Sequence, residues 1–152
     1  MTLGTGFAIA NETILLYSSE FYNLLILGMP IGLLTTNILF INQYPDYDSD
    51  KKVGKNHLVV LLGKKASRWI YGLNLILVIV SLYFIAENIL IGTKQMLFLF
   101  LLIPITMFYS YFLLSGLFKY YNSRKLIKYN IHTIYFHMLF SFIYMIILAN
   151  FQ

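Results

Sequence analysis

Four long apolar stretches alternate with short polar segments along the chain. They run roughly over Phe21–Asn42, Trp69–Leu90, Gln95–Phe118 and Tyr129–Ala149. At about 1.5 Å of rise per residue, each stretch is long enough to cross about 30 Å of hydrocarbon as a helix. The pattern therefore predicts an all-α, polytopic transmembrane helix bundle that forms a single membrane domain over residues 1–152.

A further apolar stretch, Met1–Ala10, precedes the first span and is too short to cross a membrane. It has neither the basic segment nor the small-residue cleavage site of a signal peptide. We expect it to be the end of a helix whose beginning lies outside this sequence. The chain is thus expected to be a fragment with four full spans and a partial N-terminal one.

The composition excludes an ordinary soluble domain. Hydrophobic residues make up 59% of the chain and charged residues only 11%, whereas about a quarter of the residues of a soluble domain are charged. Cysteine is absent, which rules out disulfides and thiolate metal sites. The net charge of +5 does not indicate nucleic acid as a partner, because the basic residues lie in short segments between spans, where membrane proteins use them to set topology.

The distribution of the basic residues predicts the orientation in the membrane. Ten of the eleven lie in two segments that two spans separate: Lys51, Lys52, Lys55, Lys64, Lys65 and Arg68, then Lys119, Arg124, Lys125 and Lys128. Both segments must face the same side, and the positive-inside rule places them in the cytoplasm, with Gln152 on the opposite side of the cell's inner (plasma) membrane. Aromatic residues near span ends are typical of side chains that anchor a helix at the membrane interface, and here they are Tyr44, Trp69, Tyr71, Tyr120 and Tyr121.

An acidic cluster follows the first span. Three of the six acidic residues of the chain are Asp46, Asp48 and Asp50, and carboxylates beside hydrocarbon are costly enough to indicate a function. If the segment is helical, Asn42, Asp46 and Asp50 extend the inner face of the first span and Asp48 points away. Two carboxylates on one face need a cation between them, and Mg²⁺ binds one or two carboxylates together with phosphate oxygens. The spacing predicts a magnesium–diphosphate site.

The lysines that follow fit the same chemistry. Lys51, Lys52 and Lys55 can neutralise diphosphate oxygens, and such charges lower the barrier to C–O cleavage as negative charge builds on the departing oxygen. The residues alone leave open a solvated loop with ion pairs worth under about 1 kcal/mol each. A calcium loop is excluded, because Lys51 and His57 occupy the positions that require Gly and a bidentate Glu.

Residues Asn42–Gly63, NQYPDYDSDKKVGKNHLVVLLG, resemble the second aspartate-rich motif of the UbiA superfamily of intramembrane prenyltransferases. The resemblance is greatest to the 1,4-dihydroxy-2-naphthoate polyprenyltransferase branch, which has N-E-F-P-D-x-x-x-D-x-x-x-G-K-x-T-L-x-V-x-L-G here. Met1–Gly6 resembles the fifth helix of that family, and the later spans resemble its last three. The resemblance implies the C-terminal half of a nine-helix bundle, with Mg²⁺ as cofactor and with prenyl transfer from a polyprenyl diphosphate to an aromatic acceptor.

The resemblance also implies roles for individual residues. Asp46 and Asp50 match the metal-binding and catalytic pair, and the diphosphate-binding residues would be Asn42, Lys51, Lys52 and Lys55. Two positions depart from the family pattern: Gln43 replaces the usual Glu, and Asn56-His57 replaces a basic residue followed by Thr.

The first aspartate-rich motif of the superfamily, N-D-x-x-D-x-x-x-D, does not occur in this sequence. Because the resemblance implies a site between two such motifs, a missing N-terminal half is the expected partner, and the chain alone is expected to be inactive. The favoured acceptor is 1,4-dihydroxy-2-naphthoate, in menaquinone biosynthesis. Two alternatives stay open: another acceptor such as 4-hydroxybenzoate, and a non-catalytic membrane subunit or remnant that binds diphosphates.

Several polar residues lie inside or near the predicted spans. His132 and His137 are five positions apart, so their side chains diverge on a helix, and we predict hydrogen bonds between helices rather than a metal site. Thr35, Thr36 and Asn37 permit two interpretations: they line an acceptor cavity or they join helices.

Overall fold

The computed structural model describes residues 19–89 and 93–149, and these residues form helices and no strand. The elements are α1 (Ser19–Asn42), α2 (Tyr47–Lys52), α3 (Leu58–Leu62), α4 (Lys64–Asn88), α5 (Thr93–Tyr120) and α6 (Leu126–Ala149). The four predicted spans are confirmed as helices, although α4 begins at Lys64 rather than at Trp69. Met1–Ala10, predicted to be a partial helix, lies outside the described residues.

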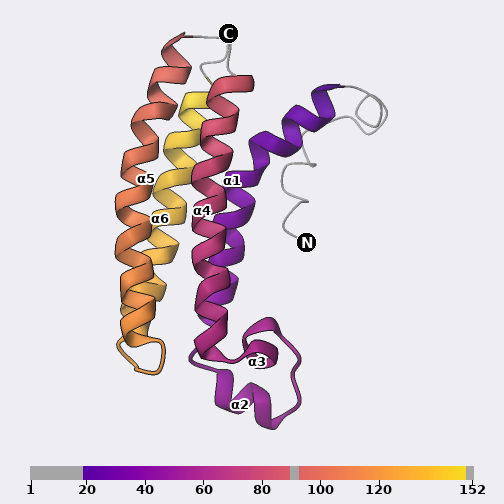
Figure 1. The fold of residues 1–152 in the computed structure, drawn as a ribbon, viewed down its shortest axis with the longest axis vertical. Helices are drawn as coiled ribbons and strands as arrows, with labels where there is room; N and C mark the ends of the chain where they lie inside the picture. The colour runs from indigo at the N-terminus through magenta and orange to yellow at the C-terminus, as the bar shows by residue number, and fades with distance from the viewer. Residues whose placement is uncertain (1–18, 90–92, 150–152) are drawn as a thin grey trace.

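The four long helices form one bundle. α1 packs against α4, α4 against α5 and α5 against α6, and α6 returns to α1. Each is long and apolar enough to cross a membrane, so the predicted fold class is confirmed. The short helices α2 and α3 lie at one end of the bundle, and the connection between α5 and α6 lies at the same end (Figure 1). We call this the polar end of the bundle, defined by residues 43–65 and 119–128.

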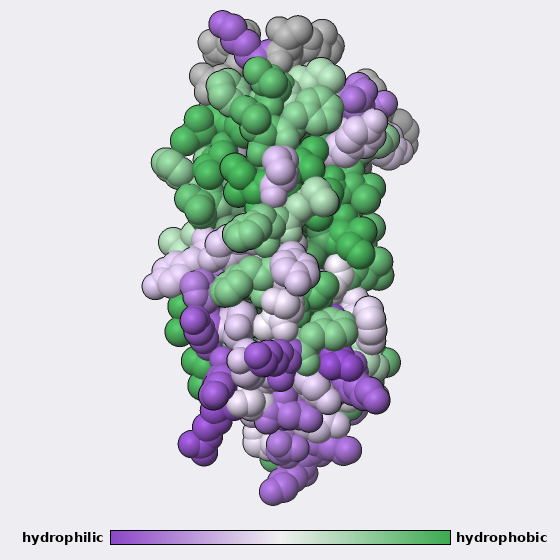
Figure 2. Space-filling model, turned by 60° about the vertical axis from the view of Figure 1, so that its left-hand side comes forward, coloured by the Kyte–Doolittle hydropathy of each residue, from purple (hydrophilic) through white to green (hydrophobic). Residues whose placement is uncertain are grey.

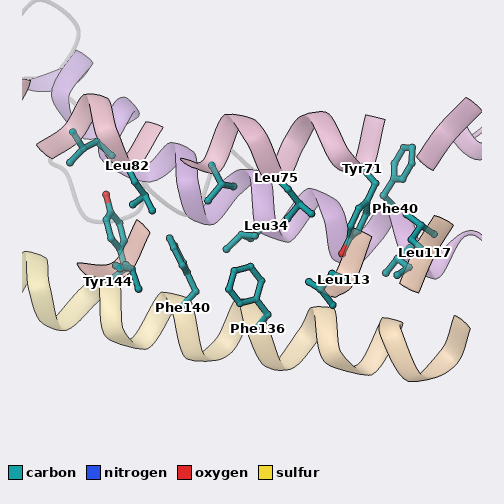
Figure 3. Close-up of a cluster of buried hydrophobic side chains, with 14 of the residues drawn as sticks. Leu34, Phe40, Tyr71, Leu75, Leu82, Leu113, Leu117, Phe136, Phe140 and Tyr144 are labelled. Carbon is teal, nitrogen blue, oxygen red and sulfur yellow. The ribbon is translucent and has the colours of Figure 1, made fainter. Parts of the chain in front are cut away.

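Large apolar side chains from the long helices fill the interior of the bundle (Figure 3). They include Leu34 of α1, Leu75 and Leu82 of α4, Leu113 and Leu117 of α5, and Phe136, Phe140 and Tyr144 of α6, all at most 4% exposed. The outward faces are also apolar: Phe108 is 76% exposed and Tyr111 is 74% exposed. Exposed apolar surface of this extent would aggregate in water, so these faces fit contact with lipid.

Buried polar groups join the helices. The Asn37 side chain of α1 is fully buried; its Nδ2 donates to the Tyr71 carbonyl of α4 at 3.2 Å, and its Oδ1 accepts from Asn74 Nδ2 at 2.9 Å. We call these three groups the amide bridge. Thr35 Oγ1 of α1 lies 2.9 Å from His137 Nε2 of α6. For Thr35 and Asn37, the structure supports the interpretation in which they join helices, whereas Thr36 Oγ1 donates to Gly32 O within α1.

The histidine prediction is confirmed. Besides the contact of His137 with α1, His132 Nδ1 of α6 lies 3.1 Å from the Tyr109 hydroxyl of α5. The interface prediction was wrong for Tyr44 and Tyr71, which are buried, and it stays a prediction for Trp69, which is 66% exposed. The Tyr71 hydroxyl lies 2.9 Å from Thr133 Oγ1 of α6, because its position on α4 faces the other helices rather than lipid.

Asn37→Leu is expected to lower the free energy of unfolding by about 1 kcal/mol, the size of an interhelical hydrogen bond in a membrane protein. The substitution removes both hydrogen bonds of the Asn37 side chain with α4 and leaves the Asn74 amide without its acceptor. Titration with SDS in mixed micelles measures the difference. Thr36→Val is the matched control, because Thr36 Oγ1 donates only to Gly32 of its own helix; equal losses in the two variants would contradict the prediction.

Candidate functional site

A turn ends α1 and begins the polar end of the bundle. Gln43 N donates to Phe40 O at 3.2 Å and Tyr44 N to Ile41 O at 3.3 Å, a tighter pattern than that of an α-helix. Pro45 follows, and a proline has no N–H to donate and disfavours helical geometry in the residue before it. Tyr44 is 1% exposed, so it anchors the turn in the bundle.

This turn corrects one expectation. We expected Asn42, Asp46 and Asp50 to extend the inner face of the first span, but the helix stops at Asn42 and residues 43–46 form the turn. Asn42 is exposed, whereas Asn37 and Ile41 of the same helix are buried. Asn42 therefore lies at the edge of the polar end, and its alignment with Asp46 through a continuous helix was wrong.

Asp46 and Asp50 are one helical turn apart on α2. Asp46 is the N-cap residue of this helix, and its carbonyl accepts from Asp50 N at 2.8 Å, the hydrogen bond of an α-helical turn. Asp46 is exposed and its side chain makes no capping bond. Asp48 belongs to a different contact, because its Oδ2 lies 3.7 Å from Lys64 Nζ at the start of α4.

The Asp50 carboxylate is held from two sides. Lys55 Nζ donates to Oδ1 at 2.6 Å, and His57 Nε2 lies 2.9 Å from Oδ2. The hydrogen bond from Lys55, supported by the one from His57, lowers the pKa of Asp50, and the Asp50 carboxylate raises the pKa of Lys55. Both groups are therefore charged at neutral pH. The structure brings together two of the predicted site residues, Asp50 and Lys55, and adds His57.

His57 was not among the predicted site residues. It is the N-cap residue of α3, where its Nδ1 accepts from Val60 N at 3.3 Å. Val59 is fully buried and α3 packs on α4, which fixes the short helix against the bundle. Gly54 and Gly63 have φ values of +74° and +79°, a region that favours glycine. They allow the chain to reverse after α2 and again before α4.

The other predicted lysines are open to solvent. Lys51 and Lys52 are exposed on the last turn of α2, and Lys51 Nζ lies 5.7 Å from the centre of the Tyr47 ring. A hollow of about 420 Å³ lies beside α2. Its lining consists of Tyr47, Asp48, Lys64, Lys65, Tyr121 and Asn122. Because neither Asp46 nor Asp50 lines it, the hollow is separate from the acidic pair.

The acidic pair fits magnesium as a partial set of ligands. Within residues 19–89 and 93–149, no three His, Cys, Asp or Glu side chains form a group that could hold a metal. Asp46 and Asp50 offer hard carboxylate oxygens, and each Asp50 oxygen keeps a lone pair beyond its present hydrogen bond. Mg²⁺ completes its shell with water and phosphate oxygens when a protein supplies one or two carboxylates, so the pair suits a phosphorylated ligand.

The surroundings suit such a ligand. Hydrophilic side chains gather at the lower end of the molecule in Figure 2, and hydrophobic ones cover most of the face above it. α2 and α3 therefore lie at the hydrophilic end of an apolar bundle.

The family model for UbiA prenyltransferases matches residues 2–148, nearly the whole chain. The chain belongs to the UbiA prenyltransferase family. Searches among curated proteins and solved structures found no match. Membership in the UbiA family supports a prenyltransferase activity in general, and with the four apolar helices it indicates an integral membrane protein. The predicted superfamily is thus confirmed, whereas the menaquinone branch stays a prediction.

Proposed function

We propose that this UbiA-family chain forms one wall of a Mg²⁺-dependent site that binds a polyprenyl diphosphate and transfers the prenyl group to an aromatic acceptor. The observation that carries the proposal is the ionised Asp50 carboxylate, one helical turn from Asp46 and beside Lys55, at the polar end of an apolar bundle. The favoured acceptor is 1,4-dihydroxy-2-naphthoate, in menaquinone biosynthesis, on the strength of the motif in residues 42–63.

Different residues of the loop would bind the metal and the diphosphate. Asp46 and Asp50 would hold Mg²⁺, which when bound supplies positive charge to the diphosphate as the C–O bond breaks. Lys51 and Lys52, exposed on α2, and Lys55, whose side chain is 62% exposed, neutralise the remaining diphosphate oxygens. Asn42, exposed at the end of α1, offers an amide donor to the same group. The positive-inside rule favours a cytoplasmic position for this end of the bundle.

We propose that a second segment completes the binding site opposite α2. The motif N-D-x-x-D-x-x-x-D does not occur in the sequence, so a segment that carries it, on the same polypeptide or on a separate one, would face α2. Without that segment the chain is expected to bind diphosphate and to transfer no prenyl group. The same observation favours a second candidate function, a non-catalytic membrane subunit that binds diphosphates.

The test is a transfer assay in membranes that contain this chain together with a segment carrying the first motif. Polyprenyl diphosphate is supplied with either 1,4-dihydroxy-2-naphthoate or 4-hydroxybenzoate, and the prenylated product is measured by chromatography. We expect product with the naphthoate, none after EDTA treatment, and recovery when Mg²⁺ is restored.

Three other results of this assay would change or overturn the proposal. Product with 4-hydroxybenzoate alone would change the acceptor and keep the mechanism. Equilibrium dialysis of radiolabelled diphosphate on the same membranes measures binding, and Mg²⁺-dependent binding without any transfer would select the non-catalytic function. Absence of both transfer and binding would overturn the assignment of the acidic pair.

A further inference from the structure

Both ring nitrogens of His57 have partners, and the partners determine where the ring carries its hydrogen. Val60 N is a backbone donor, so the Nδ1 atom 3.3 Å away must accept. The hydrogen of the ring therefore belongs on Nε2, which lies 2.9 Å from Asp50 Oδ2 and donates to it. One ring thus caps α3 and holds a carboxylate of α2.

The two partners of Asp50 differ in how firmly the fold holds them. The Lys55 side chain is 62% exposed, and its ammonium group donates to Oδ1 of Asp50. The His57 side chain is only 18% exposed and is held at Nδ1 by the α3 backbone. Lys55 can leave Oδ1 by breaking one partly buried ion pair, because its own side chain is exposed, whereas His57 cannot turn away from Oδ2 without losing the cap of α3.

The position of α3 adds to this difference. The short helix is fixed on α4 through the buried Val59, while five residues at or on α2, namely Asp46, Asp48, Ser49, Lys51 and Lys52, are exposed. The contact of Asp50 with His57 therefore links α2 to α3, the short helix that packs on α4.

We propose that His57 is a positioning residue, which keeps Oδ2 of Asp50 in place and leaves Oδ1 to the ligand when Lys55 moves to the diphosphate. This inference rests on the proposed function, because it assumes that Asp50 faces a metal–diphosphate complex. It assigns a role to a position where the sequence departs from the pattern that residues 42–63 otherwise resemble.

His57→Thr is designed to remove the contact with Asp50 while keeping the cap of α3. Threonine is a preferred N-cap residue, so α3 keeps its cap, but its side chain is too short to replace Nε2 at Asp50. His57→Gln is the conservative variant, because its amide has both a donor and an acceptor. Equilibrium dialysis of radiolabelled inorganic diphosphate at saturating Mg²⁺, against the full chain in lipid nanodiscs, measures the affinity of each variant and of Asp50→Asn.

We expect His57→Thr to bind about tenfold to a hundredfold more weakly, the usual effect of removing a group that orients a metal ligand, with an unchanged melting temperature. His57→Gln is expected to recover most of the affinity. Unchanged affinity in His57→Thr, with a loss in Asp50→Asn, would overturn the role of His57 alone. Unchanged affinity in Asp50→Asn would overturn the proposed function and this inference together.

A second measurement does not depend on metal or diphosphate. The side-chain ¹⁵N resonances of His57, assigned by their disappearance in His57→Gln, are expected to show hydrogen on Nε2 and none on Nδ1 in the ligand-free protein. Hydrogen on Nδ1 would contradict the geometry on which the role rests.

Discussion

Asparagine in place of Asp46 or Asp50 is expected to lower prenyl transfer by about a hundredfold or more, the effect of removing a charged group that stabilises a transition state. Each substitution keeps the size of the side chain and removes one of two carboxylate ligands. The loss is expected in turnover, measured in membranes that also contain the first aspartate-rich motif, while the amount of protein in the membrane stays the same.

Asp48→Asn is the matched control for these variants. Asp48 lies on the same short helix and the substitution removes the same charge, but its carboxylate is directed to Lys64 across 3.7 Å, and its side chain is 81% exposed. Exposed ion pairs contribute little, so this variant is expected to retain activity within about twofold. Equal losses in all three variants would show that only the net charge of α2 matters and would remove the assignment of the pair.

Gly116→Ala is expected to destabilise the packing of α5 on α6 by about 1–3 kcal/mol, the cost of overfilling a packed interior. A Cβ added at Gly116 would overlap the ring of Tyr129. That ring cannot move freely, because it stacks on Tyr120 at a centroid distance of 5.6 Å and contacts Phe112 at 5.3 Å. SDS titration of the free energy of unfolding measures the effect.

Gly28→Ala supplies the contrast, because within residues 19–89 and 93–149 no atom beyond the neighbouring turns of α1 lies within 4 Å of a Cβ added there. Since alanine is a better helix former than glycine, this variant is expected to gain up to about 1 kcal/mol. In a Tyr129→Ala background, Gly116→Ala should lose most of its effect, as expected for two residues in contact. A full effect in that background would show that the Tyr129 ring is not the cause.

The spans could be predicted from the sequence because a run of twenty or so apolar residues has few alternatives to a membrane helix. The sequence did not predict which particular side chains of a span face the other helices. Tyr71 lies near a predicted span end, which suggested an interface residue, yet its hydroxyl pairs with Thr133 on a helix far along the chain. Such a partner depends on helix packing, which the apolar pattern of α4 does not encode.

The helical spacing of Asp46 and Asp50 was predictable, and the contacts around them were not. The spacing of Asp46 and Asp50 predicted that they lie one helical turn apart, and the hydrogen bond from Asp50 N to Asp46 O confirms this. Pro45 explains why Asn42 does not join them, although the residue spacing suggested that it would. His57 was missed because histidine is not among the side chains normally expected at an N-cap, and the contact of Asp48 with Lys64 joins residues that no local pattern connects.

The amide bridge determines more than the stability of one helix pair. Residues 43–63 connect the end of α1 to the start of α4, so the separation of these two helices fixes the distance that the loop has to span. The contacts of Asn37 with Tyr71 and Asn74 hold that separation from within the bundle. A substitution at the buried amides is therefore expected to change the geometry of the loop, although these residues lie inside the bundle and not in the loop itself.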